Sequence, residues 1–265
     1  MKKDYLFNKY KKDFSDRISK IFEGIDKLEK EILNINIKKN FTLDISQLSI
    51  DELKREIIKY FQYNNGSLGF DIILIKYTLK EILKYIYLTE EKKLSEEEKN
   101  TCSLELKVRF YFFLNCIYNF KEKLESFFNI SDNKGKGISF KNDTILSNNG
   151  KKYISELFNK SYEKIKDYCG ARGSIVHGIY EIKYNILKNE INISTSKFNL
   201  SEENISGKVK RKYSFVLNDK KLVKLVEEMQ KIRKKIIMFL LNTKKNIDLK
   251  KLTDKFKNGK GIYKF

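Results

Sequence analysis

The sequence predicts a mainly α fold: a helical bundle with a small antiparallel β-hairpin or three-stranded insertion before the last helix. Three observations lead to this class. The 265-residue chain contains no proline, which suits long helices because proline removes a backbone donor and clashes with the preceding turn. Apolar residues recur at steps of three and four, the spacing of an amphipathic helix. Between residues 179 and 217 the spacing changes to the alternation of strands.

The first 63 residues form a predicted N-terminal helical extension. The apolar residues at positions 7, 10, 14, 18, 21, 25, 28 and 32 fall on one face of a helix of several turns. After a loop, Ser49 and Glu52 have the spacing of a capping box, which predicts the start of a second helix. The sequence NNGSLG at 64–69 is typical of a turn.

The predicted core, residues 70–243, begins with two central helices. Residues 70–88 are apolar around nearly the whole circumference, which is typical of a helix buried on all sides. Ser95 is a predicted cap, and residues 103–129 form the second central helix. Residues 131–150 are rich in glycine, asparagine and lysine, and they predict a long mobile loop.

The rest of the core combines helices and strands. A helix is expected over 151–169. Alternating segments then predict three strands, at 180–187, 191–198 and 207–217. Asn218 or Asp219 caps a long final helix. We expect a single domain over residues 1–245, followed by a basic C-terminal tail over 246–265.

The chain is strongly basic, with a formal net charge of +20 at pH 7. Such a charge attracts polyanions, RNA among them. The lysine-rich composition of an AT-rich genome, spread over solvated helix faces, explains the same excess equally well. An anionic membrane surface is less favoured, because the sequence has no lipidation motif. The charge alone therefore does not identify the partner.

Cysteine usage and hydropathy indicate the compartment. Cys102, Cys116 and Cys169 are odd in number and far apart, which argues against a disulfide framework and against a zinc site. The charged N-terminus lacks a secretory apolar region, and no apolar stretch has the length of a membrane span. We expect a cytoplasmic protein without a membrane partner, a metal or another cofactor.

One short stretch, GARGSIVHGIY at 170–180, combines the chemistry of a small active site. It contains His177, the only histidine, five residues after Arg172, one of six arginines. Histidine exchanges protons near neutral pH, and arginine directs two hydrogen bonds toward a phosphate. Imidazole acting on a 2′-hydroxyl or a leaving oxygen, with guanidinium stabilising the phosphorane, is a minimal set of groups for cutting RNA. Because there is one histidine, a second proton-transfer group must come from another residue or a second subunit.

The stretch ARGSIVHGIYEI resembles the signature of the HEPN superfamily, in which Arg is followed by four to six residues and then His. The resemblance covers about a dozen residues closely and the helices between 70 and 243 more loosely. It implies a bundle of about four helices, with the motif near the end of the third or the start of the fourth. It also implies a homodimer that brings two motifs together.

The resemblance implies a function as well: metal-independent RNA cleavage that leaves a cyclic phosphate, in a toxin or antiphage-defence effector with an antitoxin or another defence-system partner. Arg172 would bind or polarise the phosphate, and His177 would transfer the proton.

The sequence departs from the family pattern at several positions. Gly173 stands where the family often has Asn, and Ser174 is the candidate substitute, one position later. Tyr180 lies one residue beyond the place where one toxin branch has a modified tyrosine, so modification by a nucleotidyltransferase partner is not supported. Ser174 and Tyr180 remain candidate substrate-binding residues, Tyr180 by stacking on a base. The inserted strands also depart from the minimal bundle.

Other interpretations stay open. His177 is a lone helix-end histidine in the simplest one, with Arg172 paired to a carboxylate such as that of Asp167. The alternative function is a non-catalytic HEPN-like module that binds RNA or a nucleotide. A helical scaffold whose basicity comes from its genome is the weakest option. RNA cleavage that depends on His177 separates the first function from the others.

Overall fold

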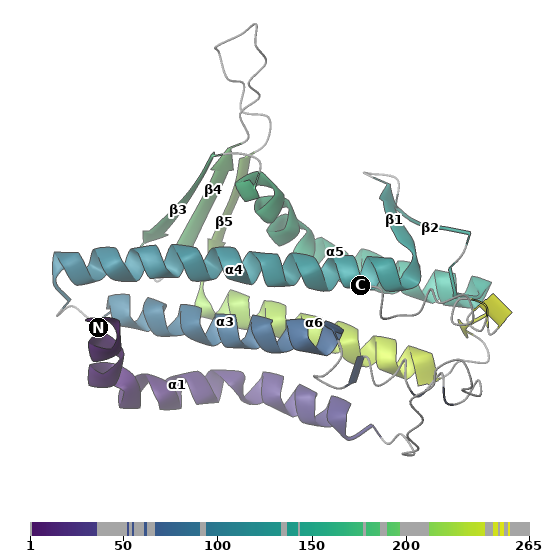
Figure 1. The fold of residues 1–265 in the computed structure, drawn as a ribbon, viewed down its shortest axis with the longest axis horizontal. Coiled ribbons are helices and arrows are strands. Elements are labelled where there is room, and N and C mark those ends of the chain that lie inside the picture. Colours follow the sequence, from purple (N-terminus) through teal and green to yellow (C-terminus); the bar gives the residue numbers. More distant parts are fainter. Residues whose placement is uncertain are drawn as a thin grey trace, which may run out of the picture. The chain divides into compact units, whose positions relative to one another are not determined.

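The predicted mainly helical class is confirmed by a computed structural model (Figure 1). It describes residues 2–35, 52, 55, 61–62, 67–90, 94–133, 137–142, 144–176, 179–185, 190–196, 212–241, 246–248, 250–251 and 254. Within these residues the helices are α1 (Lys2–Leu33), α3 (Ser67–Glu90), α4 (Glu96–Phe128), α5 (Asn148–Val176) and α6 (Asp219–Leu241). The strands are β1 (Ile130–Asn133), β2 (Gly137–Phe140), β3 (Ile179–Asn185), β4 (Glu190–Ser196) and β5 (Lys212–Leu217).

The chain divides into two compact units, and these helices contribute residues to both. Unit 1 consists of Met1–Asp26, Leu74–Tyr118 and Lys166–Glu227. Unit 2 consists of Lys27–Ile73, Asn119–Ile165 and Glu228–Phe265. The single domain over 1–245 stays a prediction. Ser49 of the predicted capping box and residues 64–66 of the predicted turn lie outside the described residues.

Helix α3 is buried over most of its length, but not on all sides as its apolar circumference predicts, because Tyr77 is 57% exposed. In unit 1 its buried apolar side chains are those of Ile75, Leu79, Ile82, Leu83, Tyr85, Ile86, Tyr87 and Leu88. The predicted caps are also present. Glu98 N donates to Ser95 Oγ over 3.2 Å and Ser95 N to Glu98 Oε2 over 2.7 Å, a complete capping box at the start of α4. Asn218 Oδ1 accepts from Lys221 N over 2.9 Å and caps α6.

The strands before α6 form one antiparallel sheet in the order β3-β4-β5. Its register aligns Ile182 with Ile193 and Ile193 with Phe215 across the three strands. The alternating pattern therefore located this insertion, although each strand begins or ends a few residues from its predicted bound.

Residues 131–150 are not the long loop that their composition predicts. Strands β1 and β2 pair antiparallel, from Ile130 opposite Phe140 to Asn133 opposite Gly137. Asn129, with φ of 52°, adopts the left-handed conformation that ends α4 directly before β1. Glycine and lysine are concentrated between the strands, whereas isoleucine and phenylalanine within them favour pairing.

The start of the C-terminal segment packs against the beginning of α5. Leu146 and Ile247 form an isolated antiparallel bridge, and Ser147 N donates to Asn246 O over 3.0 Å. A Cβ at position 150 would lie 2.1 Å from Asn246 O, so this close approach requires Gly150. Residues 246–248 are thus held by backbone contacts with α5 and the residues before it.

A buried arginine organises the polar interior of unit 2. Arg233 of α6 is fully buried, and its guanidinium donates to the carbonyls of Phe61 and Gln62 and to Gln230 Oε1. Burial lowers the pKa of Arg233 to about 10, against the opposing effect of the Glu29 charge, so the group stays charged at neutral pH.

Gln62 extends this network to the end of α1. Its Nε2 donates to the carbonyls of Ile32, Leu33 and Ile35, over 2.9, 3.0 and 2.9 Å. The last carbonyls of a helix lack their usual α-helical partner, so these bonds add a donor at the end of α1, where Ile32 O also accepts from Ile35 N.

We predict that Arg233→Met destabilises the protein by about 3 kcal/mol, because it removes the donor for several buried acceptors. The measurement is urea unfolding followed by circular dichroism. Lys234→Met is the matched control: Lys234 is on the same helix, and its ion pair with Glu31 is solvent-accessible at 37% and 38% side-chain exposure. Equal losses in the two variants would contradict the structural role of Arg233.

Candidate functional site

The Arg172 and His177 motif lies where α5 ends. Arg172 is within the helix, four residues before its last residue, Val176. His177 and Gly178 lie outside the described residues, and β3 begins at Ile179. The backbones of Ser174 and Tyr180 belong to α5 and β3, but their side chains are not among the described ones. The structure therefore places Arg172 in detail and the other candidate residues only by their elements.

Helix α5 continues past its predicted end at residue 169, through Gly170 and Gly173, to Val176. Each glycine inside a helix costs about 1 kcal/mol relative to alanine, which is why the sequence predicted an earlier end. Packing outweighs that cost here, because Cys169 is 7% exposed and Ala171 is fully buried. Arg172 consequently extends from a regular helix rather than from a loop.

The Arg172 side chain is held by two residues of α4. Its Nε donates to Asn115 Oδ1 over 3.1 Å, and its Cζ lies 4.2 Å from the ring centroid of Tyr118. All three residues belong to unit 1. Among the described residues, its Nη1 and Nη2 donate to no acceptor. This half-buried guanidinium therefore keeps its terminal amino groups for a ligand or for the part of the chain that is not described.

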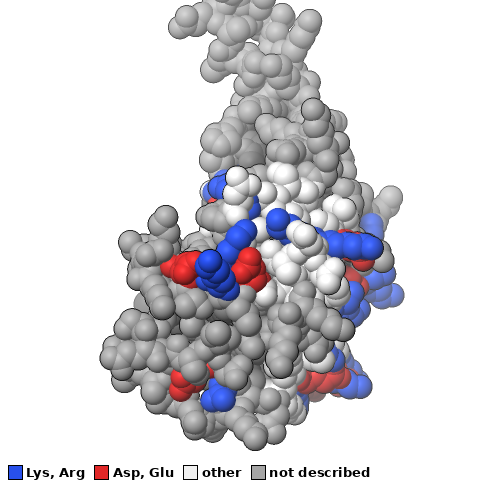
Figure 2. All heavy atoms as spheres, turned by 90° about the vertical axis from the view of Figure 1, so that its right-hand side faces the viewer, with Lys and Arg blue, Asp and Glu red and all other residues white. Residues whose placement is uncertain are grey.

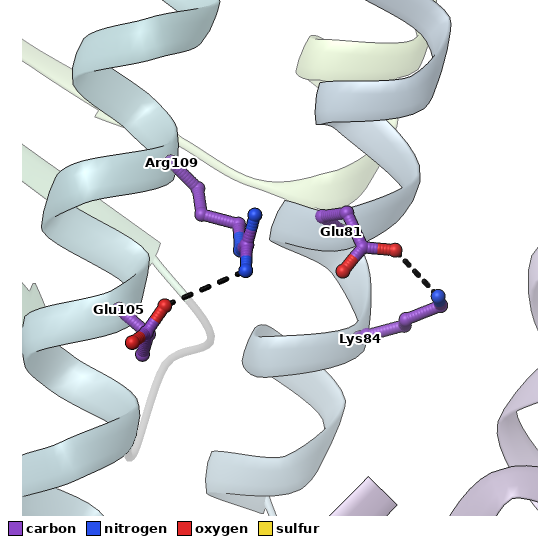
Figure 3. Close-up of polar contacts among 4 residues, drawn as sticks. All are labelled: Glu81, Lys84, Glu105 and Arg109. Atoms are coloured by element: carbon purple, nitrogen blue, oxygen red, sulfur yellow. Dashed lines mark hydrogen bonds and ion pairs between the residues drawn. The ribbon is translucent and has the colours of Figure 1, made fainter. Parts of the chain in front are cut away.

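A second polar cluster of unit 1 is paired internally (Figure 3). Arg109 Nη2 of α4 lies 3.5 Å from Glu105 Oε2, and Lys84 bonds to Glu81 on α3. Burial lowers the pKa of Arg109, but its hydrogen bond to Tyr85 and the carboxylates of Glu81 and Glu105 together raise it above the ordinary value. Since each charge has an opposite charge nearby, this cluster is better suited to holding helices together than to binding an anion.

The cysteines do not form a nucleophilic site. Cys102, Cys116 and Cys169 are buried, and none of them forms a disulfide. Burial, followed by the charges of Glu98 and Glu105, raises the pKa of the Cys102 thiol to about 11. This thiol is therefore protonated at neutral pH.

Other features of the described residues limit the choice of site. Figure 2 shows one face, on which several basic side chains lie beside acidic ones. No group of three His, Cys, Asp or Glu side chains in the described part of the chain is arranged to hold a metal ion. None of the described helices is long and apolar enough to cross a membrane.

Sequence reasoning found Arg172 but missed the residues that hold it. Asn115 is 57 residues away, a separation that no local pattern reports. The available signal was a polar residue inside the apolar run FYFFLNCIYNF of a central helix. The side chain of Asp167, the carboxylate considered for Arg172, is outside the described set.

Comparisons with protein-family models, curated proteins and solved structures find no match for this chain.

The contact between Arg172 and Asn115 predicts a measurable coupling. In a double-mutant cycle of Arg172→Met and Asn115→Ala, the effects on urea unfolding should be non-additive by about 1 kcal/mol, since either change alone removes the same hydrogen bond. A cycle of Arg17→Met and Asn115→Ala is the control. Arg17 lies over the ring of Tyr87, and among the described residues it makes no contact with Asn115. Additivity in both cycles would show that the contact contributes nothing in solution.

Proposed function

We propose that the chain is a metal-independent endoribonuclease in which Arg172 binds and polarises the phosphodiester and His177 transfers a proton. The observation that carries this proposal is the state of Arg172. Its guanidinium is fixed through Nε and one face, and its two Nη atoms have no acceptor among the described residues. It also stands five residues before the only histidine. A charged, pre-oriented fork with a proton-transfer residue five positions later in the sequence suits phosphate chemistry.

The proposed reaction needs no external reactant. The 2′-oxygen attacks the adjacent phosphorus, the bond from phosphorus to the 5′-oxygen breaks, and a 2′,3′-cyclic phosphate remains. One proton leaves the 2′-hydroxyl and one is delivered to the departing 5′-oxygen. His177 performs one transfer, and Arg172 stabilises the negative charge that builds up on the non-bridging oxygens. Ser174 and Tyr180 are proposed to contact the RNA.

The second proton transfer favours a homodimer, because a second copy supplies the other imidazole. The resemblance of RGSIVH to the HEPN signature supports the same assembly, and it also supports a role as a toxin or antiphage-defence effector with a partner protein that restrains it. The net charge of +20 supports RNA as the polyanion.

The test is incubation of the purified protein with total RNA and tRNA in EDTA. We predict cleavage by the wild type and a loss of at least about 100-fold in His177→Ala and in Arg172→Ala, the usual size for an acid–base group or an oxyanion-stabilising donor. Arg17→Ala is the matched control: Arg17 is an exposed arginine of unit 1 that also lies over a tyrosine ring, 3.7 Å from the Tyr87 centroid.

The outcomes separate the candidate functions. Cleavage that survives in His177→Ala, or that falls equally in Arg17→Ala, contradicts the proposed mechanism. Salt-sensitive RNA binding without any cleavage supports the non-catalytic module instead. If the protein neither cleaves nor binds RNA at physiological salt, the helical scaffold is the only remaining interpretation.

A further inference from the structure

The contacts between α4 and Arg172 determine which edge of the Arg172 guanidinium can bind a ligand. The guanidinium group has two edges that bind an oxyanion with paired hydrogen bonds: the side edge of Nε and one Nη, and the end edge of Nη1 and Nη2. Asn115 Oδ1 occupies Nε over 3.1 Å. Only the end edge is therefore available for a bidentate contact with a phosphate.

Asn115 is itself fixed by the backbone of α4. Its Nδ2 donates to the carbonyl of Tyr111, one turn earlier, over 3.1 Å. Turning the amide over would place NH₂ against the Nε–H of Arg172 and leave the Tyr111 carbonyl facing an oxygen. The two contacts thus determine a single amide orientation, in which the oxygen faces Arg172.

Tyr118 restricts the remaining freedom of the guanidinium. Its ring centroid lies 4.2 Å from Arg172 Cζ, within the range of a cation–π contact. One face of the group is thereby covered while Asn115 holds its side edge. A side chain ordered in this way before the ligand arrives loses less entropy on binding.

The acceptor that holds Arg172 is neutral, whereas the acceptor that holds Arg109, six residues before Asn115 on α4, is charged. Arg109 is held by the carboxylate of Glu105 at 3.5 Å, which offsets its charge. Asn115 orients Arg172 and leaves the full positive charge to an incoming anion.

We propose that Asn115 and Tyr118 are positioning residues that present the end edge of Arg172, with its charge undiminished, to a phosphodiester of RNA. This inference rests on the proposed function for the identity of the ligand. It assigns to α4 a part of the site that the Arg172 and His177 motif does not contain.

The decisive variant is Asn115→Asp, which keeps the size of the side chain and strengthens its bond to Arg172. Asp loses the donor to the Tyr111 carbonyl, as Ala does, but unlike Ala it keeps an acceptor for Arg172 Nε. A role in the fold alone therefore gives no reason for Asp to bind RNA less well than Ala when both variants are folded. We expect Asp to bind RNA less well than Ala. In a His177→Ala background, Asn115→Asp should weaken RNA binding at least about tenfold and reduce the salt slope by about one, because one cation no longer neutralises a phosphate.

The other variants separate orientation from charge. In cleavage assays with His177 intact, Asn115→Ala should lower kcat about tenfold or more with a smaller change in KM, because the charge remains but its position is lost. Tyr118→Leu removes the ring that lies over Arg172 and should lose several-fold in kcat. Thermal unfolding of every variant verifies that it is folded at the assay temperature.

The result distinguishes this inference from the function on which it rests. If RNA is cleaved, but Asn115→Asp binds and cleaves as well as the wild type, the positioning role is wrong and the ribonuclease stands. If no variant cleaves, but Asn115→Asp alone lowers binding and the salt slope, the ribonuclease is wrong and the positioning of Arg172 for a phosphate stands. If the wild type neither binds nor cleaves RNA, both are overturned.

Discussion

A guanidinium inside a helical protein needs an acceptor for each of its nitrogens, and unit 2 depends on how this requirement is met at Arg233. Its Nε, Nη1 and Nη2 donate to Phe61 O, Gln230 Oε1 and Gln62 O. Gln62 in turn satisfies the last carbonyls of α1. One buried charge therefore connects α6, residues 61–62 and the end of α1. Such a group contributes to a unique arrangement only because each of its nitrogens has a partner.

The two helix-borne arginines Arg109 and Arg172 of unit 1 are held differently, and the difference distinguishes the candidate site. Arg109 is balanced by carboxylates and a tyrosine, so its charge is used within the fold. Arg172 receives one neutral acceptor and one aromatic face, and its remaining donors have no acceptor among the described residues. An arginine whose charge is balanced by carboxylates is suited to holding helices together, whereas one that is oriented by neutral groups keeps its charge for a ligand. This contrast supports the proposed role of Arg172 independently of the motif.

Patterns with a local cause were predictable from the sequence. The caps at Ser95 and Asn218 and the alternation of β3, β4 and β5 each depend on neighbouring residues, and each is present, as is most of the predicted burial of α3. Features that depend on distant packing were not. The extension of α5 through Gly170 and Gly173, the β1–β2 hairpin and the partnership of Arg172 with Asn115 depend on residues brought together only by folding. The candidate site was thus predictable as a motif, but its support from α4 was not.

The central claim is that Arg172 and His177 cut RNA by activating the 2′-hydroxyl of the RNA itself. The most direct test of this claim is to identify the chemical groups at the two ends that cleavage produces. A defined oligonucleotide cleaved in EDTA should yield a 2′,3′-cyclic phosphate and a 5′-hydroxyl by mass spectrometry, and the same oligonucleotide with 2′-deoxy at the cut position should remain intact. A 3′-hydroxyl with a 5′-phosphate, or cleavage of the 2′-deoxy substrate, would mean that water attacks the phosphorus and would contradict the account.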